Sequence, residues 1–407
     1  MKIATMRLVD RWLGMPICFF LTVFRKCHDL FSLQQKSQPK KIRSILFVKL
    51  AEQGATVLAD AALRRAVKMA GKENVYFMAF AQNRFIVDVM DVIPAKNVIP
   101  IPDSNLISLL FGTLDALRQV RSLKINAVVD FEFFARSSAI LTYLSGAGIR
   151  VGLHGFGDGS PYRGDLMTHR LNYNPHVHTS VLFDVMVAAL EQPAQYTPRL
   201  DMDLPLPANI TSHFQCGEDE LNAFKAILES QAGTSDYSPL ILLNSNASDM
   251  LPLRRWPTEL YVELARRLLE KSPALHVAFT GAPDEAEKAQ RLVAEVASSR
   301  CFSMTGKTTL RQLLMLYGIA DVLVTNDSGP AHFATLTDIQ VITLFGPETP
   351  RLFGAITPRS HIIWKNIPCS PCVSAYNNRF STCTNNVCMQ RIGVDEVFDA
   401  VCGIARL

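Results

Sequence analysis

Short apolar runs alternate with longer amphipathic stretches from residue 42 onward. The run Ile-Leu-Phe-Val-Lys-Leu at 45–50 is typical of a buried strand, and residues 56–70 carry apolar side chains at helical spacing. Further strands are expected at 75–80, 97–101, 127–131 and 149–152, and further helices at 106–123, 135–144 and 176–189. Strands and helices that alternate in this way predict a parallel sheet with helices on both faces.

The same alternation begins again after residues 192–207, a stretch with four prolines that is typical of a connection between domains. Strands are expected at 240–243, 276–280 and 321–325, and helices at 258–270, 284–297 and 309–317. We therefore predict two doubly wound, Rossmann-like α/β domains, 41–205 and 206–407, that face a cleft.

Residues 1–40 form a separate region. The segment Leu13–Phe24 is apolar and has basic residues on both sides. It is shorter than the roughly 20 residues that span a bilayer, and no small-x-small cleavage site follows it. We expect an N-terminal helix at the surface of an anionic membrane, followed by a polar linker. Packing of this helix on the protein's own core and a true membrane span are the alternatives.

Composition narrows the class of protein. With 48% hydrophobic and 19% charged residues, the chain is globular and not disordered. The net charge of +4 is small for 407 residues, and no stripe of Lys and Arg with interleaved aromatic residues points to nucleic acid. Nine cysteines without a secretory signal favour a reducing compartment.

The stretch from Val322 to Pro347 carries the clearest chemistry. A buried strand leads into Asn-Asp-Ser-Gly-Pro-Ala-His at 326–332, then a short helix, a second strand and a Gly-Pro turn. Ser328 is expected to cap the helix, whose free N–H groups and positive dipole end favour an anion. Asp327 and His332 flank this helix start, where a parallel sheet binds nucleotides. The alternatives are that Asp327 only caps the helix and that His332 is a satisfied buried histidine.

This stretch resembles the C-terminal signature of glycosyltransferase family 9, the heptosyltransferases of lipopolysaccharide core synthesis. Three further motifs are similar to those of the family: Asn-Ser-Asn-Ala-Ser at 244–248, Arg-Arg-Trp-Pro at 254–257 and Phe-Thr-Gly-Ala-Pro-Asp-Glu at 279–285. In the first half, Asp-Phe-Glu-Phe-Phe-Ala-Arg-Ser at 130–137 is similar to the family's Asp-x-x-x-x-x-Arg-Ser. The resemblance runs from about residue 42 to the end and implies the GT-B fold.

The resemblance implies a set of substrate-binding residues. Arg255 would hold the donor's diphosphate, since a guanidinium fork can bind two phosphate oxygens at once; otherwise it is a solvated cation. Arg136 would hold an anionic acceptor or a donor phosphate; otherwise it pairs with Asp130 or Glu132. The full set is Gly54, Arg136, Asn246, Ser248, Arg255, Thr280, Gly281, Ser328, Gly329 and His332.

One expected residue is missing. The family's Leu-x-x-x-Gly-Asp loop matches at Leu50 and Gly54, but its catalytic aspartate falls at Ala55. The inverting transfer that the family implies needs a base for the acceptor hydroxyl. We assign Glu52 as this base and Asp327 as a second catalytic residue. The rival bases are Asp60, Asp130 and Glu132, and Glu52 could instead be a surface carboxylate or a partner of Lys49.

Four cysteines follow the spacing Cys369-x2-Cys372-x10-Cys383-x4-Cys388, which is typical of a tetrathiolate metal site. Zinc is the default ion and an iron–sulfur cluster the alternative. Such a site would be structural. Two disulfides or four free thiols are the rival interpretations. No cofactor is expected for catalysis, because no Asp-x-Asp motif lies in a suitable loop.

The resemblance implies a glycosyltransferase that moves a sugar from a nucleotide-diphospho-sugar, ADP-heptose within this family, to a lipopolysaccharide-type or other envelope glycan. We expect the enzyme in the cytoplasm, on the inner face of the bacterial cytoplasmic membrane. Two other classes stay open. A GT-B sugar-nucleotide epimerase would turn over donor without acceptor, and a catalytically impaired nucleotide-sugar-binding protein is favoured by Ala55.

Overall fold

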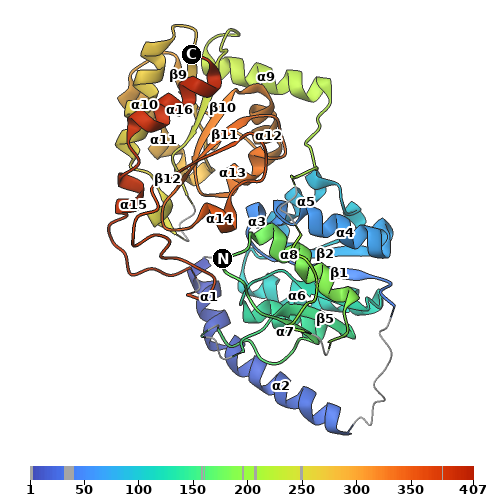
Figure 1. The fold of residues 1–407 in the computed structure, drawn as a ribbon. Helices are drawn as coiled ribbons and strands as arrows, with labels where there is room; N and C mark the ends of the chain where they lie inside the picture. The colour runs from blue at the N-terminus through green and yellow to red at the C-terminus, as the bar shows by residue number, and fades with distance from the viewer. Residues whose placement is uncertain are drawn as a thin grey trace. The chain divides into compact units, whose positions relative to one another are not determined.

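The computed structural model describes residues 3–31, 41–156, 159, 161–194, 197–205, 209–247, 251–377 and 379–407. The chain forms two compact units (Figure 1). Unit 1 comprises Met1–Ala208 and the short segment Ala375–Arg379, and unit 2 comprises Asn209–Ser374 and Phe380–Leu407. Each unit is an α/β domain with its own parallel sheet, as the alternating pattern predicts.

Unit 1 contains six parallel strands in the order β3-β2-β1-β4-β5-β6. The central strands pair from Ile45 with Ala127 to Val48 with Asp130, and both are buried along their whole length. The short edge strand β6 is not evident from the hydrophobic pattern. The strands are β1 (Ile45–Val48), β2 (Val75–Phe80), β3 (Val98–Ile101), β4 (Ala127–Asp130), β5 (Ile149–Leu153) and β6 (His169–Leu171).

The helices of unit 1 follow the expected pattern, except that the helix Arg84–Met90 was not predicted and one predicted helix is divided in two. The helix predicted over 56–70 is two helices, because a tight hydrogen bond from Ala59 N to Thr56 O (3.1 Å) ends the first of them. The helices are α3 (Gln53–Val57), α4 (Asp60–Ala70), α5 (Arg84–Met90), α6 (Leu106–Ser122), α7 (Arg136–Leu144) and α8 (Thr179–Ala188), with 3₁₀ turns η1 (Lys72–Asn74), η2 (Ala81–Asn83), η3 (Ala95–Asn97) and η4 (Ala189–Glu191).

Two further helices, α1 (Ile3–Trp12) and α2 (Gly14–Phe31), precede this sheet. Helix α2 packs on unit 1 through the stripe Gly14, Cys18 and Thr22, and its other sides are largely exposed. Gly14 lies so close to α7 that a Cβ atom there would be 2.7 Å from Arg136 Cβ. Among the described residues, no helix has the length and apolar character needed to span a bilayer.

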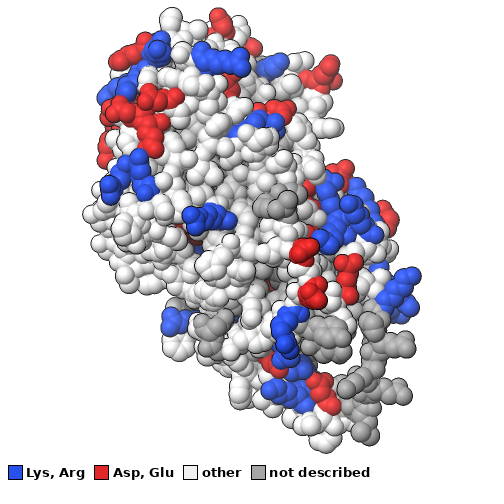
Figure 2. Space-filling model, viewed as in Figure 1, with Lys and Arg blue, Asp and Glu red and all other residues white. Residues whose placement is uncertain are grey.

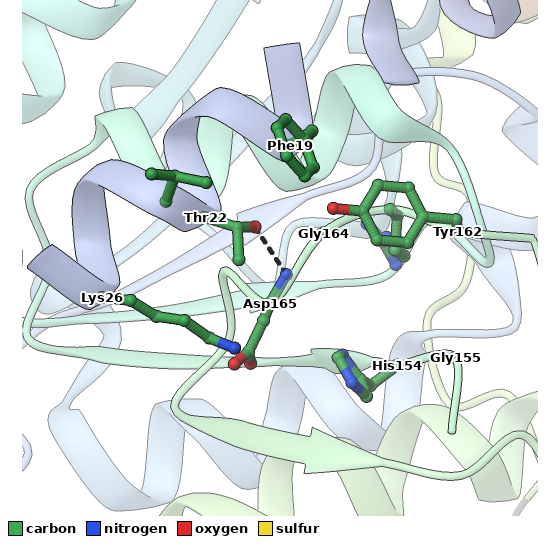
Figure 3. A pocket seen from close by; sticks show the side chains of 10 residues that line it. Phe19, Thr22, Lys26, His154, Gly155, Tyr162, Gly164 and Asp165 are labelled. Atoms are coloured by element: carbon green, nitrogen blue, oxygen red, sulfur yellow. Dashed lines mark hydrogen bonds between the residues drawn. The ribbon is translucent and has the colours of Figure 1, made fainter. Parts of the chain in front are cut away.

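Polar contacts also hold α2 in place. Thr22 Oγ1 accepts a hydrogen bond from Asp165 N (2.9 Å), and Arg25 pairs with the Asp165 carboxylate (2.6 Å). A cavity lies beside these contacts, between α2 and residues 154–155 and 162–165, and Figure 3 shows Phe19 and Tyr162 among the side chains that line it. The N-terminal helix is therefore packed on unit 1 along one side only.

Unit 2 repeats the topology with the order β12-β11-β10-β7-β8-β9, again fully parallel. Its largest core cluster lies on one face of the central strands and includes Trp256, Tyr261 and Phe279, each 1% exposed or less. The strands are β7 (Leu240–Asn244), β8 (His276–Phe279), β9 (Cys301–Ser303), β10 (Val322–Asn326), β11 (Gln340–Phe345) and β12 (Ser360–Trp364).

The helices predicted at 258–270, 284–297 and 309–317 are present with bounds shifted by at most two residues, whereas the helices Glu218–Ala232 and Val394–Ala405 were not predicted. Thr309 caps α12 with a capping box to Gln312. The helices are α9 (Glu218–Ala232), α10 (Thr258–Lys271), α11 (Ala286–Val296), α12 (Leu310–Ile319), α13 (Gly329–Ala334), α14 (Pro350–Phe353), α15 (Val387–Gln390) and α16 (Val394–Ala405), with 3₁₀ turns η6 (Pro252–Arg254) and η7 (Pro283–Glu285).

Strand order fixes where each unit can bind a ligand. In both sheets the order reverses at the central pair, β1 with β4 in unit 1 and β7 with β10 in unit 2. Loops that leave the carboxyl ends of such a pair diverge and leave room for a ligand. Charge gives no comparable guide, because Figure 2 shows Lys and Arg side chains interspersed with Asp and Glu over the face that it draws.

Candidate functional site

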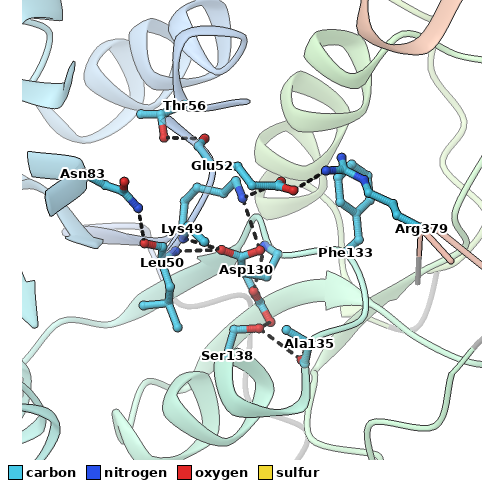
Figure 4. A network of polar contacts seen from close by, with 12 residues as sticks. Lys49, Leu50, Glu52, Thr56, Asn83, Asp130, Phe133, Ala135, Ser138 and Arg379 are labelled. Atoms are coloured by element: carbon cyan, nitrogen blue, oxygen red, sulfur yellow. Dashed lines mark hydrogen bonds and ion pairs between the residues drawn. The ribbon is translucent and has the colours of Figure 1, made fainter. Parts of the chain in front are cut away.

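A buried lysine organises the carboxyl edge of unit 1. Lys49 directly follows β1 and is fully buried. Its Nζ atom lies 3.2 Å from Glu132 Oε2 and 3.3 Å from Glu52 Oε2 (Figure 4). Burial opposes the charge of Lys49, but the carboxylates of Glu132 and Glu52 outweigh it and raise the lysine pKa above its ordinary value.

Glu132 uses its other oxygen to shape the loop after β1. Its Oε1 atom accepts hydrogen bonds from Leu50 N (2.7 Å) and Ala51 N (3.0 Å). Both carboxylate oxygens of Glu132 are therefore taken up by Lys49 and the loop backbone. This arrangement gives Glu132 the role of holding the loop that carries Glu52.

Glu52 is held by two cations. It pairs with Lys49 from the end of β1 and with Arg379 from the segment 375–379, and Figure 4 shows Glu52 between them. Its φ of 67° lies in the left-handed region, which costs a non-glycine residue roughly 1–3 kcal/mol and is found often at functional loops. The pairing with Lys49, which the sequence also allows, is present, and the Glu52 side chain stays 20% exposed.

Asp130 ends β4 but does not face solvent. Its carboxylate forms an ion pair with Arg163 and accepts a hydrogen bond from Ser138 Oγ (3.0 Å). Arg163 also donates to Phe133 O (2.7 Å), so one buried guanidinium binds several groups around the strand end. Burial raises the pKa of Asp130 to about 6 although Arg163 opposes this shift. Asp130 therefore supports the edge of the sheet and is out of reach of a substrate.

The four carboxylates considered as a base are thus unequal. Asp60 at the start of α4 is 1% exposed and pairs with Arg64 (3.1 Å), and Asp130 is fully buried. Only Glu52 and Glu132 keep exposed side-chain surface, and Glu132 is occupied by backbone N–H groups. Gly54 and Ala55 lie in the adjoining helix α3.

Arg136 has a partner that the sequence does not reveal. The carboxylate of Asp10 in α1 accepts hydrogen bonds from Arg136 N (3.0 Å) and Ser137 N (2.7 Å) at the start of α7. It also lies 3.5 Å from the Arg136 guanidinium. The expected alternative pairing of Arg136 with Asp130 or Glu132 is therefore wrong.

In unit 2, one group of residues gathers where β7 and β8 end. Asn244 donates to Thr280 O (3.2 Å) across the two strands. Gly281 is packed so tightly that a Cβ atom there would lie 2.6 Å from Glu285 Oε2 and 3.2 Å from Asn246 Nδ2. Burial raises the pKa of Glu285, and nearby Arg255 opposes the shift. The structure thus brings together Asn246, Thr280, Gly281 and Arg255, whereas Ser248 lies outside the described residues.

Arg255 itself is engaged with the backbone. Its guanidinium donates to Ala247 O from Nε (3.2 Å) and Nη2 (2.8 Å) and so holds the turn after β7. Asn326 at the end of β10 ties the same turn to the neighbouring loop, since it donates to Asn246 O (3.1 Å) and accepts from Trp256 N (2.9 Å). The described residues 244–247 of the first motif and the motifs at 254–257 and 326–332 therefore meet at one edge.

A second group gathers where β10 and β11 end. Arg254 Nη1 lies 3.5 Å from Glu348 Oε2 and 4.0 Å from Asp327 Oδ2. All three side chains are at most 11% exposed. Arg254 Nε has no hydrogen-bond partner among the described residues. A buried cation with an unused donor, flanked by two carboxylates, is typical of a ligand-binding site.

Helix α13 starts beside this group, with one correction to the expected cap. Ser328 occupies the N-cap position, but its hydroxyl donates to Asn326 O (3.2 Å) and makes no cap hydrogen bond to the helix. The predicted capping by Ser328 is therefore wrong, because the hydroxyl completes the strand end instead. Gly329 opens the helix, and His332 is 7% exposed within it.

A model of the family described as glycosyltransferase family 9 (heptosyltransferase) matches residues 117–380, which is more than half of the chain. The chain belongs to glycosyltransferase family 9. The lipopolysaccharide heptosyltransferase 2 of Salmonella typhimurium is 29% identical over 168 residues, 40% of this chain and 46% of the relative. The chain thus spans about half the length of the curated relatives it matches.

Solved structures extend the likeness of this family 9 chain to the whole fold. The E. coli ADP-heptose lipopolysaccharide heptosyltransferase II is 18% identical with a TM-score of 0.66, covering 89% of this chain and 98% of that one. The family 9 glycosyltransferase of Veillonella parvula is also 18% identical, with a TM-score of 0.68 over 91% and 99% of the two chains. The predicted GT-B fold is therefore confirmed.

The cysteine-rich segment of this family 9 chain lies beside β11. Cys372 N donates to Pro347 O (3.0 Å). Burial raises the pKa of the Cys388 thiol to about 11, and the thiols of Cys369, Cys372 and Cys383 also act to raise it. All nine cysteines are free thiols, so the disulfide interpretation is wrong. Among the described residues, no three His, Cys, Asp or Glu side chains are arranged to hold a metal ion.

Between Cys372 and Cys383 the chain leaves unit 2 and contributes residues 375–379 to unit 1. Tyr376 OH donates to Tyr173 O (2.9 Å), and the Tyr376 ring stacks on Phe134 with centroids 6.0 Å apart. Arg379 reaches Glu52 and lies over the Phe133 ring. This short segment therefore supplies one of the two cations on Glu52.

Sequence reasoning missed Arg163, Arg254, Glu348, Arg379 and Asp10. A sequence signal for Arg254 exists, because this residue stands in the Arg-Arg-Trp-Pro motif beside Arg255. Glu348 directly follows the Gly-Pro turn after β11, a position where the same strand-end argument applies. No sequence signal marks the other three, since each reaches its partner from a distant segment.

Proposed function

We propose that this family 9 glycosyltransferase transfers a heptose from ADP-heptose to a lipopolysaccharide-type acceptor with inversion at the anomeric carbon. The observation that carries the proposal is the family match over residues 117–380, which includes the Arg254–Asp327–Glu348 group. The names of the relatives support both substrates, since these proteins are lipopolysaccharide or lipooligosaccharide heptosyltransferases.

Unit 2 would hold the donor. Arg254 has an unused Nε donor, and the Arg255 guanidinium lies at the adjoining turn, so both can balance the charge of the diphosphate leaving group. The N–H groups of Ser328 and Gly329 would add hydrogen bonds, and Asp327 would accept from a sugar hydroxyl. Asn246, Thr280, Gly281 and His332 would complete the nucleotide-sugar site.

Unit 1 would supply the base. The acceptor hydroxyl oxygen forms a bond to the anomeric carbon while the bond to the diphosphate oxygen breaks and the nucleoside diphosphate leaves with the electron pair. The hydroxyl proton passes to the Glu52 carboxylate. Lys49 and Arg379 would position the Glu52 carboxylate, and Gly54 and Arg136 would line the acceptor side.

The acceptor also gives α2 a role. A lipid-linked acceptor lies at the cytoplasmic face of the inner membrane, and α2 exposes Phe20 and Phe24 at 68% and 64% of their surface. Such a helix, whose apolar run is followed by Arg25 and Lys26, is suited to the surface of an anionic leaflet. We place the enzyme there as a peripheral protein.

The test is transfer by the purified protein with ADP-, GDP- and UDP-sugars, with and without a lipid-glycan extract. We expect release of ADP only when both ADP-heptose and acceptor are present. Turnover of donor without acceptor would instead favour the epimerase. Tight binding without turnover would favour a non-catalytic nucleotide-sugar-binding protein, for which Ala55 is the specific argument.

For the cysteine segment we propose a structural metal site formed by Cys369, Cys372, Cys383 and Cys388. Their spacing supports this, although the described side chains would have to turn toward one another, since Cys383 Sγ now donates to Asn385 O (3.1 Å). Elemental analysis of protein purified without chelator should find about one zinc per chain, or about two to four irons per chain for an iron–sulfur cluster. Metal-free protein, or equal metal content after Cys369→Ser/Cys372→Ser, would contradict the proposal.

A further inference from the structure

Helix α6 of unit 1 exposes an apolar stripe that nothing in the family site uses. Asn105 and Ser108 form a capping box that fixes where the helix begins. Its first nine residues, Leu-Ile-Ser-Leu-Leu-Phe-Gly-Thr-Leu at 106–114, contain no charged side chain. Five of them are exposed at 40–70% of their surface: Leu106, Ile107, Leu110, Phe111 and Leu114.

The stripe continues into positive charge on the same side of the helix. Residues 107, 111, 114, 118 and 121 follow the alternating spacing of four and three that keeps side chains on one face. Arg118 and Arg121 stand at the last two of these positions, and Lys124 follows the helix end. Asp115 is the only acidic residue from 106 to 124, and it forms an exposed ion pair with Arg118 (2.6 Å). One face of α6 is therefore apolar over its first half and basic over its second.

Helix α6 and the N-terminal helix α2 are linked through helix α7. Ala116, Leu117 and Val120 bury the opposite face of α6 in the core cluster that also contains Leu141 of α7. Both helices thus cover the same face of the sheet, and α2 packs against α7. Unit 2, by contrast, exposes large apolar side chains at scattered described positions: Ile227, Ile362, Phe380 and Val387.

We infer that the exposed face of α6 is a second membrane contact, which inserts its apolar first half into an anionic lipid leaflet while its arginines bind the headgroups. The charge pattern favours a leaflet over a protein partner, because exposed Leu, Ile and Phe side chains next to a basic segment match the apolar and anionic layers of a bilayer surface. The inference rests on the proposed function only in that a lipid-linked acceptor brings the enzyme to a membrane.

Two membrane contacts on unit 1, at α2 and α6, would determine how the enzyme is oriented on the membrane. One amphipathic helix allows a protein to rotate about the helix axis, whereas two separated helices on one domain restrict its orientation. The carboxyl edge of the sheet, where both α6 and α7 begin, would then be kept at the depth of the headgroups. That is where the hydroxyl of a lipid-linked glycan would be found.

The test is co-flotation of the full chain with vesicles of phosphatidylcholine containing about one-quarter phosphatidylglycerol. Phe111→Glu and the pair Leu110→Glu/Phe111→Glu should lower the bound fraction by about tenfold or more, since a charge is excluded from the apolar layer. Ile227→Glu in α9 of unit 2 is the matched control, because Ile227 is also an exposed helical side chain, and should change binding less than about twofold. Arg118→Gln should lower binding to anionic vesicles about fivefold and leave binding to pure phosphatidylcholine unchanged.

A second measurement keeps the inference falsifiable if a variant folds poorly. Phe111→Trp in a Trp12→Phe background places a fluorophore on the stripe, and brominated lipids should quench it. Vesicle binding by the α6 variants at the wild-type level, or absence of quenching, would overturn the inference. So would a dimer in solution that the α6 variants convert to a monomer, since a second copy would then cover the stripe. None of these measurements needs sugar transfer, so a failure of the proposed function would be seen separately.

Discussion

Replacing Glu52 by Gln is expected to lower kcat for sugar transfer by a factor of about 10² to 10⁴, the usual contribution of a general base. Gln keeps the size of Glu and can still bond to Lys49 and Arg379, but it cannot accept the acceptor's proton. Steady-state release of ADP in the presence of ADP-heptose and acceptor measures the effect.

Two further variants make this result specific. Glu73→Gln removes a surface carboxylate of unit 1 that also pairs with a lysine, Lys96 at 2.6 Å, and should leave the rate unchanged. Glu52→Gln/Ala55→Asp restores the family's aspartate one helical turn away and should recover part of the lost activity. A Glu52→Gln enzyme with wild-type kcat would mean that another group takes the proton.

Replacing Arg163 by Met is expected to lower the free energy of unfolding by about 3–5 kcal/mol, because it leaves the Asp130 carboxylate buried without its cation. The guanidinium also satisfies Phe133 O and Ser138 Oγ, whose hydrogen bonds would be lost as well. Urea unfolding monitored by circular dichroism measures the change. Arg170→Met is the matched control, since the Arg170 side chain is 43% exposed and its pair with Asp165 should contribute at most about 1 kcal/mol.

We expect the loss of unfolding free energy in the Arg163→Met variant to be larger at high pH than at low pH. The pKa of Asp130 in the folded protein is about 6, above its ordinary value of 3.8, so the folded state binds this proton more tightly than the unfolded chain. Proton binding by Asp130 therefore raises the free energy of unfolding. This contribution is complete below about pH 4 and is lost as the pH rises through 6. Without Arg163 the carboxyl is protonated still more readily, so the Arg163→Met deficit should be smaller at pH 5 than at pH 8. An equal deficit at both values, or no gain on adding Asp130→Asn, would contradict this account.

The fold could be predicted because its hydrophobic pattern is periodic. The buried strands 45–48, 127–130, 240–244 and 322–326 are continuous apolar runs between turn residues, and these central strands are what a parallel sheet requires. The edge strands β6, β9 and β12 were not predicted because they are short or polar, as in Ser-His-Ile-Ile-Trp at 360–364. The division between α3 and α4 was not predicted because the apolar spacing continues across it.

The candidate site was predictable only as far as it follows strand ends. Asn246, Thr280, Gly281 and Asp327 all stand directly after strands, so topology brings them to one edge. Side-chain pairing obeys no such rule. Whether Arg254 or Arg255 turns toward Asp327 depends on the 3₁₀ turn η6, and the partner of Arg136 comes from α1, more than a hundred residues earlier. The spacing of residues along the chain does not predict these contacts.

The return of residues 375–379 to unit 1 affects how this protein can be divided. Unit 1 is discontinuous in sequence, because Tyr376 and Arg379 are encoded near the C-terminus while Glu52 and Tyr173 are encoded in the first half. A gene fragment that stops between the two sheets would yield a first domain with an uncovered aromatic surface at Phe134 and one cation fewer beside Glu52. Domain exchange with other members of the family would have to carry this pentapeptide along with the first half of the gene.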